Sequence, residues 1–155
     1  MLVQRCALDQ HRLVIPVSVS KPSFDSGTFM GHFSQERHRA LVDTGAQRTV
    51  VSRTVIAEQN LFRTGHMEFS GLHGPQTHSR YLAAIGIWAH RVDSNAASAS
   101  LAGTELSIFA IETPFEVVDM DDNLNFDLIL GFDVLKQFSF KFDHQDKEFE
   151  MVVKP

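Results

Sequence analysis

Alternation of hydrophobic and polar residues is the main pattern along this chain, and it predicts many short β-strands. Side chains of a strand point alternately to its two faces, so a period of two with β-branched residues is typical of a half-buried strand. Stretches with this pattern are residues 12–20, 27–34, 39–43, 48–52, 67–71, 80–89, 105–112, 115–119, 126–130 and 138–143. Such closely spaced strands predict a mainly β barrel or sandwich.

Helical patterns are short and few. Residues 52–60 begin with Ser52, a favoured N-cap residue, and residues 131–138 offer one or two turns after Gly131. Residues 91–105 are rich in Ser, Ala, Asn and Gly, which predicts a long exposed loop. We find neither a repeat nor a domain boundary, so residues 1–155 are predicted to form a single domain.

Composition narrows the function classes. The chain has 155 residues, of which 43% are hydrophobic and 21% charged, as in an ordinary soluble domain. A net charge of −5 with scattered Lys and Arg argues against a nucleic-acid partner. Charges interrupt the apolar residues of the N-terminal stretch, and no stretch is apolar enough to span a membrane. With only Cys6 and no internal disulfide, the chain is predicted to be cytoplasmic, without a membrane partner.

The stretch "ALVDTGAQRTVVS" (40–52) carries the most specific chemical signal. Asp, Thr and Gly all favour turns, so a structural turn is one interpretation of Asp43. However, the apolar run before Asp43 places its carboxylate at the end of a predicted buried strand, where an uncompensated charge is costly. This context favours a chemical role for Asp43.

Three elements in order resemble the retropepsin-like aspartic proteases. They are "LVDTGAQRTVVS", a Gly-containing pair of strand patterns at 67–87 where that family has its flap hairpin, and "LILGFDVL" at 128–135. The resemblance covers roughly residues 12–150 and extends to the retropepsin-like domain of DNA-damage-inducible ubiquitin-shuttle proteins and to bacterial relatives. It implies the acid-protease fold, a closed β-barrel with one or two short helices.

The resemblance also implies an activity and an assembly. In such an aspartic endopeptidase, two Asp43 carboxylates, one from each protomer of a homodimer, activate a water that attacks a peptide bond. Thr44 would form a hydrogen bond across the two-fold axis, Gly45 would allow close backbone approach, and Ala46 would line the cleft. Gly131 would support the catalytic loop from behind. No metal and no other cofactor is implied.

Substrate binding is expected to involve the flap. The resemblance assigns Gly71 and Gly74 as hinge or tip residues and Leu72 and His73 as substrate contacts. His73 and Pro75 depart from the Gly-rich tip of the viral enzymes. The expected partner is an extended, largely apolar peptide or protein substrate, cleaved at acidic to mildly acidic pH.

Two other sequence signals are interpreted as structural. A similar tripeptide, Asp-Ser-Gly at residues 25–27, lacks a preceding apolar strand and is predicted to be a hairpin turn. The acidic run 119–123 has Leu124 and Leu130 where a calcium loop needs Gly and Glu, so it is predicted to be a solvated loop. The eight His residues are dispersed, so a zinc site is not predicted.

Two alternative functions remain open at this stage. The first is a catalytically inactive retropepsin-like module that dimerises or binds a peptide in its cleft. The second is a ligand-binding β-barrel unrelated to proteolysis. The intact Asp43, Thr44 and Gly45 favour the enzyme over the inactive module.

Overall fold

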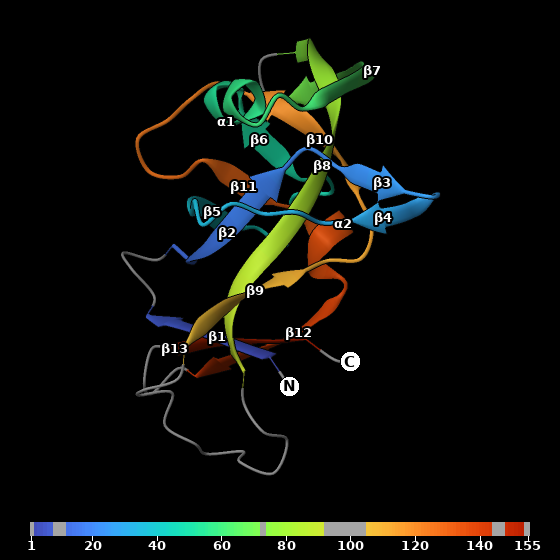
Figure 1. The fold of residues 1–155 in the computed structure, drawn as a ribbon. Helices are drawn as coiled ribbons and strands as arrows, with labels where there is room; N and C mark the ends of the chain where they lie inside the picture. Colours follow the sequence, from blue (N-terminus) through green and yellow to red (C-terminus); the bar gives the residue numbers. More distant parts are fainter. Residues whose placement is uncertain (1, 8–11, 72–73, 92–104, 144–147, 154–155) are drawn as a thin grey trace.

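The structure is a computed structural model that describes residues 2–7, 12–71, 74–91, 105–143 and 148–153. These residues form thirteen strands and two short helices, which confirms a mainly β chain with two short helices (Figure 1). The strands are β1 (Leu2–Ala7), β2 (Val14–Ser20), β3 (Ser23–Asp25), β4 (Thr28–Met30), β5 (His38–Val42), β6 (Val50–Ser52), β7 (Phe62–Gly71), β8 (Gly74–Arg91), β9 (Leu106–Ala110), β10 (Phe115–Met120), β11 (Leu128–Leu130), β12 (Phe138–Asp143) and β13 (Glu148–Val153). The helices are α1 (Arg53–Glu58) and α2 (Phe132–Leu135).

Strand β8 organises the large sheet. It is the longest strand of the described chain, at 18 residues, and it pairs with β7, β10, β2, β9 and β1 along its length (Figure 1). A closed ring of paired strands forms among the described strands. It runs through the pairings β8–β2, β2–β5, β5–β11, β11–β6, β6–β10 and β10–β8. This ring corresponds to the barrel that the sequence predicted, and the other strands of the sheet extend beyond it.

The core joins side chains of the ring strands to others from α1, α2, β12 and β13. In β11, Leu128 and Leu130 are fully buried while Ile129 between them is only partly buried. β2 and β8 contribute alternate aliphatic residues to the same core, including Val17 and Ile85, although their intervening residues, such as Ser18 and Trp88, are buried as well. Burial of these side chains is the main force that closes the ring, because each removes a large apolar area from water.

Helix α1 begins where the sequence predicted. The Ser52 hydroxyl accepts a hydrogen bond from the Val55 amide at 3.4 Å and so caps the first turn. Val55 and Ile56 are buried against the core, while the helix ends at Glu58. Asn60 follows with a positive φ of 48°, a conformation that Asn tolerates better than most residues.

Three strands, β1, β3 and β13, were missed by the sequence patterns. β1 and β13 pair antiparallel over their full length, from Leu2 opposite Val153 to Ala7 opposite Glu148. Their partners lie at opposite ends of the chain, so no local turn signal links them. The predicted loop at 91–105 falls mostly on residues outside the described part of the chain.

The Asp-Ser-Gly at residues 25–27 forms a hairpin turn, as predicted. β3 and β4 pair with Asp25 opposite Thr28, which leaves Ser26 and Gly27 as the two turn residues. Both have positive φ, 50° and 83°, as a tight two-residue hairpin requires. Asp25 is exposed there.

No helix within the described residues is long and apolar enough to cross a membrane.

Candidate active site

Asp43 directly follows the last residue of β5, at the end of a strand inside the ring. β5 runs parallel to β11, with Ala40 opposite Leu128 and Val42 opposite Leu130. The Asp43 amide continues this ladder by donating to the Leu130 carbonyl at 3.1 Å. Asp43 is itself partly buried, and the end of β5 that carries it is only partly buried, since Leu41 and Val42 are partly exposed.

The loop after Asp43 is short and internally bonded. The Gly45 amide donates to Asp43 Oδ1 at 2.8 Å, and the Ala46 amide donates to the Asp43 carbonyl at 3.3 Å. The Ala46 carbonyl in turn accepts from the Phe132 amide at 2.7 Å, which ties the loop to the start of α2. This loop, residues 43–46, has a defined shape before any partner binds.

A hollow of about 410 Å³ opens beside the loop. It is lined by Arg12, Leu13, Leu41, Val42, Asp43, Thr44 and Phe142. The Thr44 side chain is exposed, and it makes no hydrogen bond to any other described residue. The hollow therefore combines the Asp43 carboxylate, the Thr44 hydroxyl and the Arg12 guanidinium with apolar walls.

Gly131 comes very close to the backbone of Arg48, in the segment that follows the loop. A Cβ at this position would lie 2.4 Å from the Arg48 carbonyl carbon and 2.5 Å from its oxygen, so no other residue fits without backbone movement. The Gly131 amide donates to Thr49 Oγ1 at 3.0 Å. Glycine is needed here for space.

Thr49 and Asp133 hold the same segment, and sequence reasoning missed both. Thr49 is fully buried, and its hydroxyl donates to Asp133 Oδ1 at 2.7 Å while its amide donates to Oδ2 at 3.0 Å. The two residues are 84 positions apart, so they join the segment before β6 to α2. The one local signal was the Asp133 carboxylate, two residues after Gly131, which directly follows β11.

The predicted flap is a long hairpin of β7 and β8. Pairing runs from Phe62 opposite Leu82 to Gly71 opposite Gly74, with a bulge near Gly65. Leu72 and His73, the predicted substrate contacts at the tip, lie outside the described residues.

The structure does not bring all predicted site residues to one hollow. Asp43 and Thr44 line the hollow beside the loop, whereas Gly45, Ala46, Gly71 and Gly74 do not. Gly74 has a φ of +92° and open space around its Cβ position. The flap glycines are therefore hairpin residues in this chain, and their contact with a substrate stays a prediction.

The acidic run 119–123 differs from the predicted solvated loop. Asp119 lies in β10, is 6% exposed, and accepts hydrogen bonds from the Ser79 amide at 2.8 Å and from Arg53 Nε at 3.1 Å. Its carbonyl also contacts His78 Nδ1 at 3.0 Å. Burial alone would raise the pKa of Asp119, but these hydrogen bonds and charges outweigh it and lower the pKa. Asp119 thus ties the base of the flap to β10.

Asp122, in the same run, also accepts hydrogen bonds from another element. Its carboxylate accepts from the amide of Thr54 at 3.0 Å and from the hydroxyl of Thr54 at 2.7 Å. The amide hydrogen bond comes first among the causes that lower the pKa of Asp122. Local sequence hides both arrangements, because the partners lie far from the acidic run along the chain.

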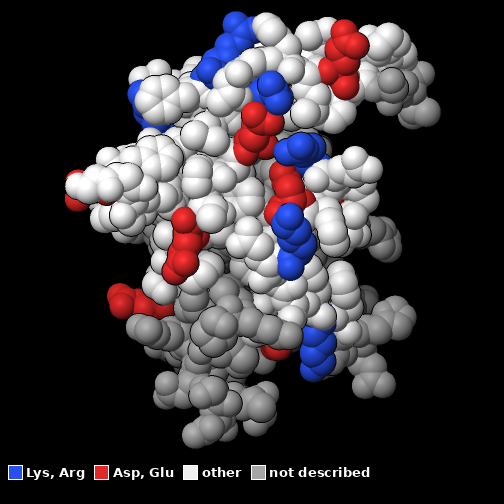
Figure 2. All heavy atoms as spheres, turned by 90° about the vertical axis from the view of Figure 1, so that its right-hand side faces the viewer, with Lys and Arg blue, Asp and Glu red and all other residues white. Residues whose placement is uncertain are grey.

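Charges on the surface are mixed. Figure 2 shows one face of the molecule, on which basic and acidic side chains are interspersed. Within the described residues, no group of three His, Cys, Asp or Glu side chains is placed to hold a metal ion.

Comparisons with known proteins support the fold. No protein-family model matches the chain, and no curated protein is significantly similar to it in sequence. A retropepsin-like aspartic protease from Rickettsia conorii has a similar structure, with a TM-score of 0.52 and 14% identity, over 96% of this chain and 90% of that one.

Two further solved structures have lower TM-scores. The retroviral protease-like domain of Ddi1 from Leishmania major has a TM-score of 0.45 and 20% identity, over 86% of this chain and 82% of that one. Simian foamy virus (mac) protease has a TM-score of 0.44 and 11% identity, over 80% of this chain and 92% of that one. At these identities the Rickettsia similarity is one of fold, so the chain has a retropepsin-like fold.

Proposed function

We propose that this retropepsin-like chain is an aspartic endopeptidase that acts as a homodimer, with Asp43 of each protomer as the catalytic pair. The observation that supports this most directly is the position of Asp43 in a loop whose backbone is bonded to Leu130 of β11 and to Phe132 of α2. A turn aspartate needs no such support, as the exposed Asp25 illustrates.

Hydrolysis of a peptide bond without a metal needs a base for the water and an acid for the leaving nitrogen. Two carboxylates held a few Å apart supply both, because they cannot both ionise and so share one proton. The ionised member takes a proton from the attacking water, and the protonated member hydrogen-bonds to the carbonyl oxygen. The tetrahedral intermediate then collapses as the nitrogen is protonated.

A single chain supplies one carboxylate in this setting. In the proposal, a two-fold axis beside the loop brings in the second Asp43, so that one sequence makes both halves of the site. The exposed Thr44 hydroxyl, which can donate and accept, would bond across this axis. Dimerisation is then required for activity.

The proposed substrate is an extended, largely apolar peptide. Leu41, Val42 and Phe142 form apolar walls beside Asp43. An extended peptide can pair its backbone with strand edges while its side chains enter such pockets. The β7–β8 hairpin would close over the peptide and exclude water.

The decisive experiment is Asp43→Asn, which preserves shape and removes the ionisable group. We expect cleavage of a mixed peptide library at pH 4–6 to fall by roughly a thousandfold or more. Asp25→Asn is the matched control, because it makes the same change in the second Asp-Ser/Thr-Gly and should leave activity intact. Full activity of the Asp43→Asn protein would exclude the proposed mechanism.

The dimer has a separate test. Sedimentation of the wild-type protein should show a dimer at every concentration at which the protein is active. Mixing it with excess Asp43→Asn protein should suppress activity, because mixed dimers contain one carboxylate. Activity from a protein that sediments only as a monomer would contradict the shared site. A dimer that binds peptides but cleaves none would instead support the inactive module.

A further inference from the structure

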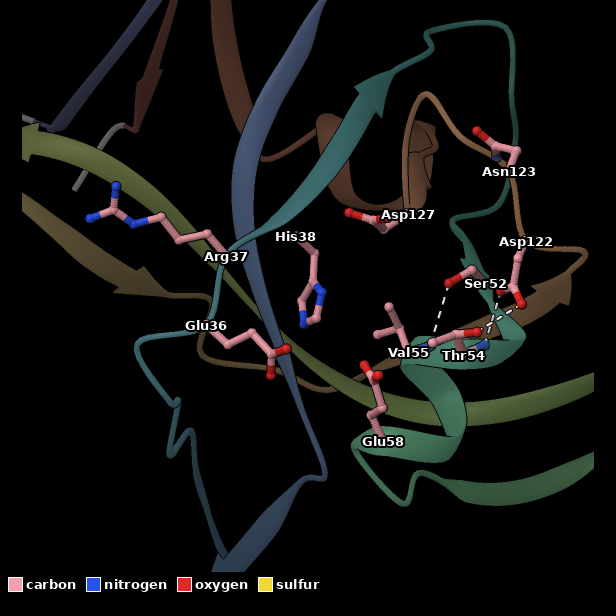
Figure 3. Close-up of a pocket in the computed structure, with 10 residues that line it drawn as sticks. All are labelled: Glu36, Arg37, His38, Ser52, Thr54, Val55, Glu58, Asp122, Asn123 and Asp127. Atoms are coloured by element: carbon pink, nitrogen blue, oxygen red, sulfur yellow. Dashed lines mark hydrogen bonds between the residues drawn. The ribbon is translucent and has the colours of Figure 1, made fainter.

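A second hollow, of about 400 Å³, lies at the opposite end of β5 from Asp43 (Figure 3). His38, the first residue of β5, lines it, and the hollow shares no lining residue with the one beside Asp43. The five residue steps from His38 to Asp43 span about 17 Å of extended chain. The second hollow is therefore a site of its own.

Four carboxylates line this hollow, and two of them already have partners. Asp127 forms an ion pair with Arg39 at 3.2 Å. Both Asp122 oxygens accept hydrogen bonds from Thr54. These two carboxylates are held by the protein itself.

The other two carboxylates, Glu36 and Glu58, leave an excess of negative charge. Both are exposed, and the Glu36 carboxylate accepts one hydrogen bond, from Gln59 Nε2 at 3.0 Å. The Glu58 carboxylate makes no hydrogen bond or ion pair with any described residue. Arg37 also lines the hollow, but its guanidinium stacks 4.2 Å from the centre of the Trp88 ring and points away from the other lining side chains (Figure 3).

His38 adds an independent sign that the hollow is built to hold a ligand. This residue is 5% exposed, and its Nε2 has no hydrogen-bond partner among the described residues. Its ring points toward the space bordered by Glu36, Val55 and Glu58 (Figure 3). A buried polar atom without a partner is costly, so a group that donates to Nε2 would stabilise this arrangement.

We propose that this hollow binds an aliphatic cation, a protonated amine or guanidinium at the end of a methylene chain. The cation would lie between Glu36 and Glu58 and donate to His38 Nε2, while the methylenes pack against Val55. A lysine ammonium fits this set well, because it offers three donors on a long apolar stem. The described residues offer no set of metal ligands here, which favours an organic cation over a metal ion.

The same chemistry can come from a lysine or arginine side chain of another protein or from a free polyamine. We would titrate the full-length protein with N-acetyl-lysine-N-methylamide, with N-acetyl-arginine-N-methylamide and with spermidine, and follow amide NMR shifts. N-acetyl-norleucine-N-methylamide, which lacks the charge, is the ligand control. Saturable shifts at residues 36–38 and 54–58 with a cationic probe are expected.

Glu36→Gln and Glu58→Gln should each weaken binding about tenfold. Asp25→Asn removes the same charge from the exposed β3–β4 hairpin and should leave binding unchanged. Binding of the two peptide-like probes identifies a protein side chain as the source, and binding of spermidine alone identifies a polyamine. No saturable shift, equal shifts with the norleucine probe, or equal weakening by Asp25→Asn would overturn the proposal.

This binding test is independent of the proposed peptidase activity. Asp43→Asn should bind the cationic probes as the wild-type protein does. An inactive protein that still binds them would therefore refute the catalytic proposal alone.

Discussion

The loop after β5 and the β7–β8 hairpin are the two regions expected to meet a substrate, and they are built in opposite ways. The loop is bonded to β11 and to the start of α2, and the segment after it is held by a backbone approach that only Gly131 permits and by the Thr49–Asp133 pair. The hairpin is a two-stranded extension of β8 whose base is tied by polar contacts, chiefly those of Asp119.

This difference separates a fixed part from a movable part. Buried hydrogen bonds between segments far apart in the sequence break only when the core opens. Contacts at the base of a two-stranded ribbon can change while the core stays closed. We therefore expect substitutions at the loop to reduce global stability and substitutions in the hairpin to affect mainly closure.

Gly131→Ala should have the largest effect on stability. The added methyl group would collide with the Arg48 backbone, which cannot rotate away as a side chain would. We expect a loss of about 3 kcal/mol in the free energy of unfolding, measured by urea denaturation. In Gly45→Ala, the nearest atom to the new Cβ is a side-chain oxygen of Asp43 at 3.2 Å, so this control should lose clearly less stability. Equal losses would mean that the backbone approach is not the constraint.

Thr49→Val should have the next largest effect. Valine preserves the shape but leaves the Gly131 amide and one Asp133 oxygen without their buried partner. We expect about 2 kcal/mol of destabilisation in the same measurement. Thr54→Val removes a similar hydroxyl–carboxylate bond at the exposed Asp122, so it should cost less. A neutral Thr49→Val protein would show that the loop does not depend on this pair.

Asp119→Asn tests the base of the hairpin and has a pH signature. Because the pKa of Asp119 is lowered in the folded protein, its stabilising contribution is complete above the ordinary Asp pKa of about 4. It is lost as the pH falls through the lower, folded value. We expect a stability difference from wild type of about 1.5 kcal/mol that is constant from pH 7 to pH 5 and shrinks below pH 4.

Asp121→Asn is the control for this change. Asp121 also pairs with Arg53, at 2.7 Å, but its side chain is 87% exposed, so its loss should have little effect at any pH. A pH-independent difference for Asp119→Asn would mean that the carboxylate charge is not what stabilises the hairpin base.

Gly74→Ala should have the smallest effect on stability. At a φ of +92° any side chain is strained, although the space around the Cβ position is open, so we expect a loss of about 1 kcal/mol. Gly27→Ala has a similar φ of +83° and equally open space, in the β3–β4 hairpin. The two variants should lose similar stability, and only Gly74→Ala should slow peptide cleavage. If both reduce cleavage alike, the flap has no separate role.

The sequence was sufficient for the features that depend on neighbouring residues. Alternation identified most strands, Ser52 marked the start of α1, and the apolar run before Asp43 placed its carboxylate at a strand end. These features depend on residues a few positions apart, so a local pattern carries them.

The sequence was insufficient where the partner is distant. The contacts of Asp119 and Asp133 were not predicted because an acidic residue near a turn is usually solvated, and the donors Arg53, Ser79 and Thr49 lie far away along the chain. β1 was missed for the same reason, since its main partner, β13, lies at the other end of the chain.

The 84 positions between Thr49 and Asp133 also set an order of events during synthesis. A ribosome releases the Asp43 loop early, but Leu130, Gly131 and Asp133, which hold it and the segment after it, emerge some eighty residues later. Until then the nascent chain carries the aspartate without the backbone that fixes it. The candidate catalytic loop is thus assembled late, when nearly all of the barrel is already outside the ribosome.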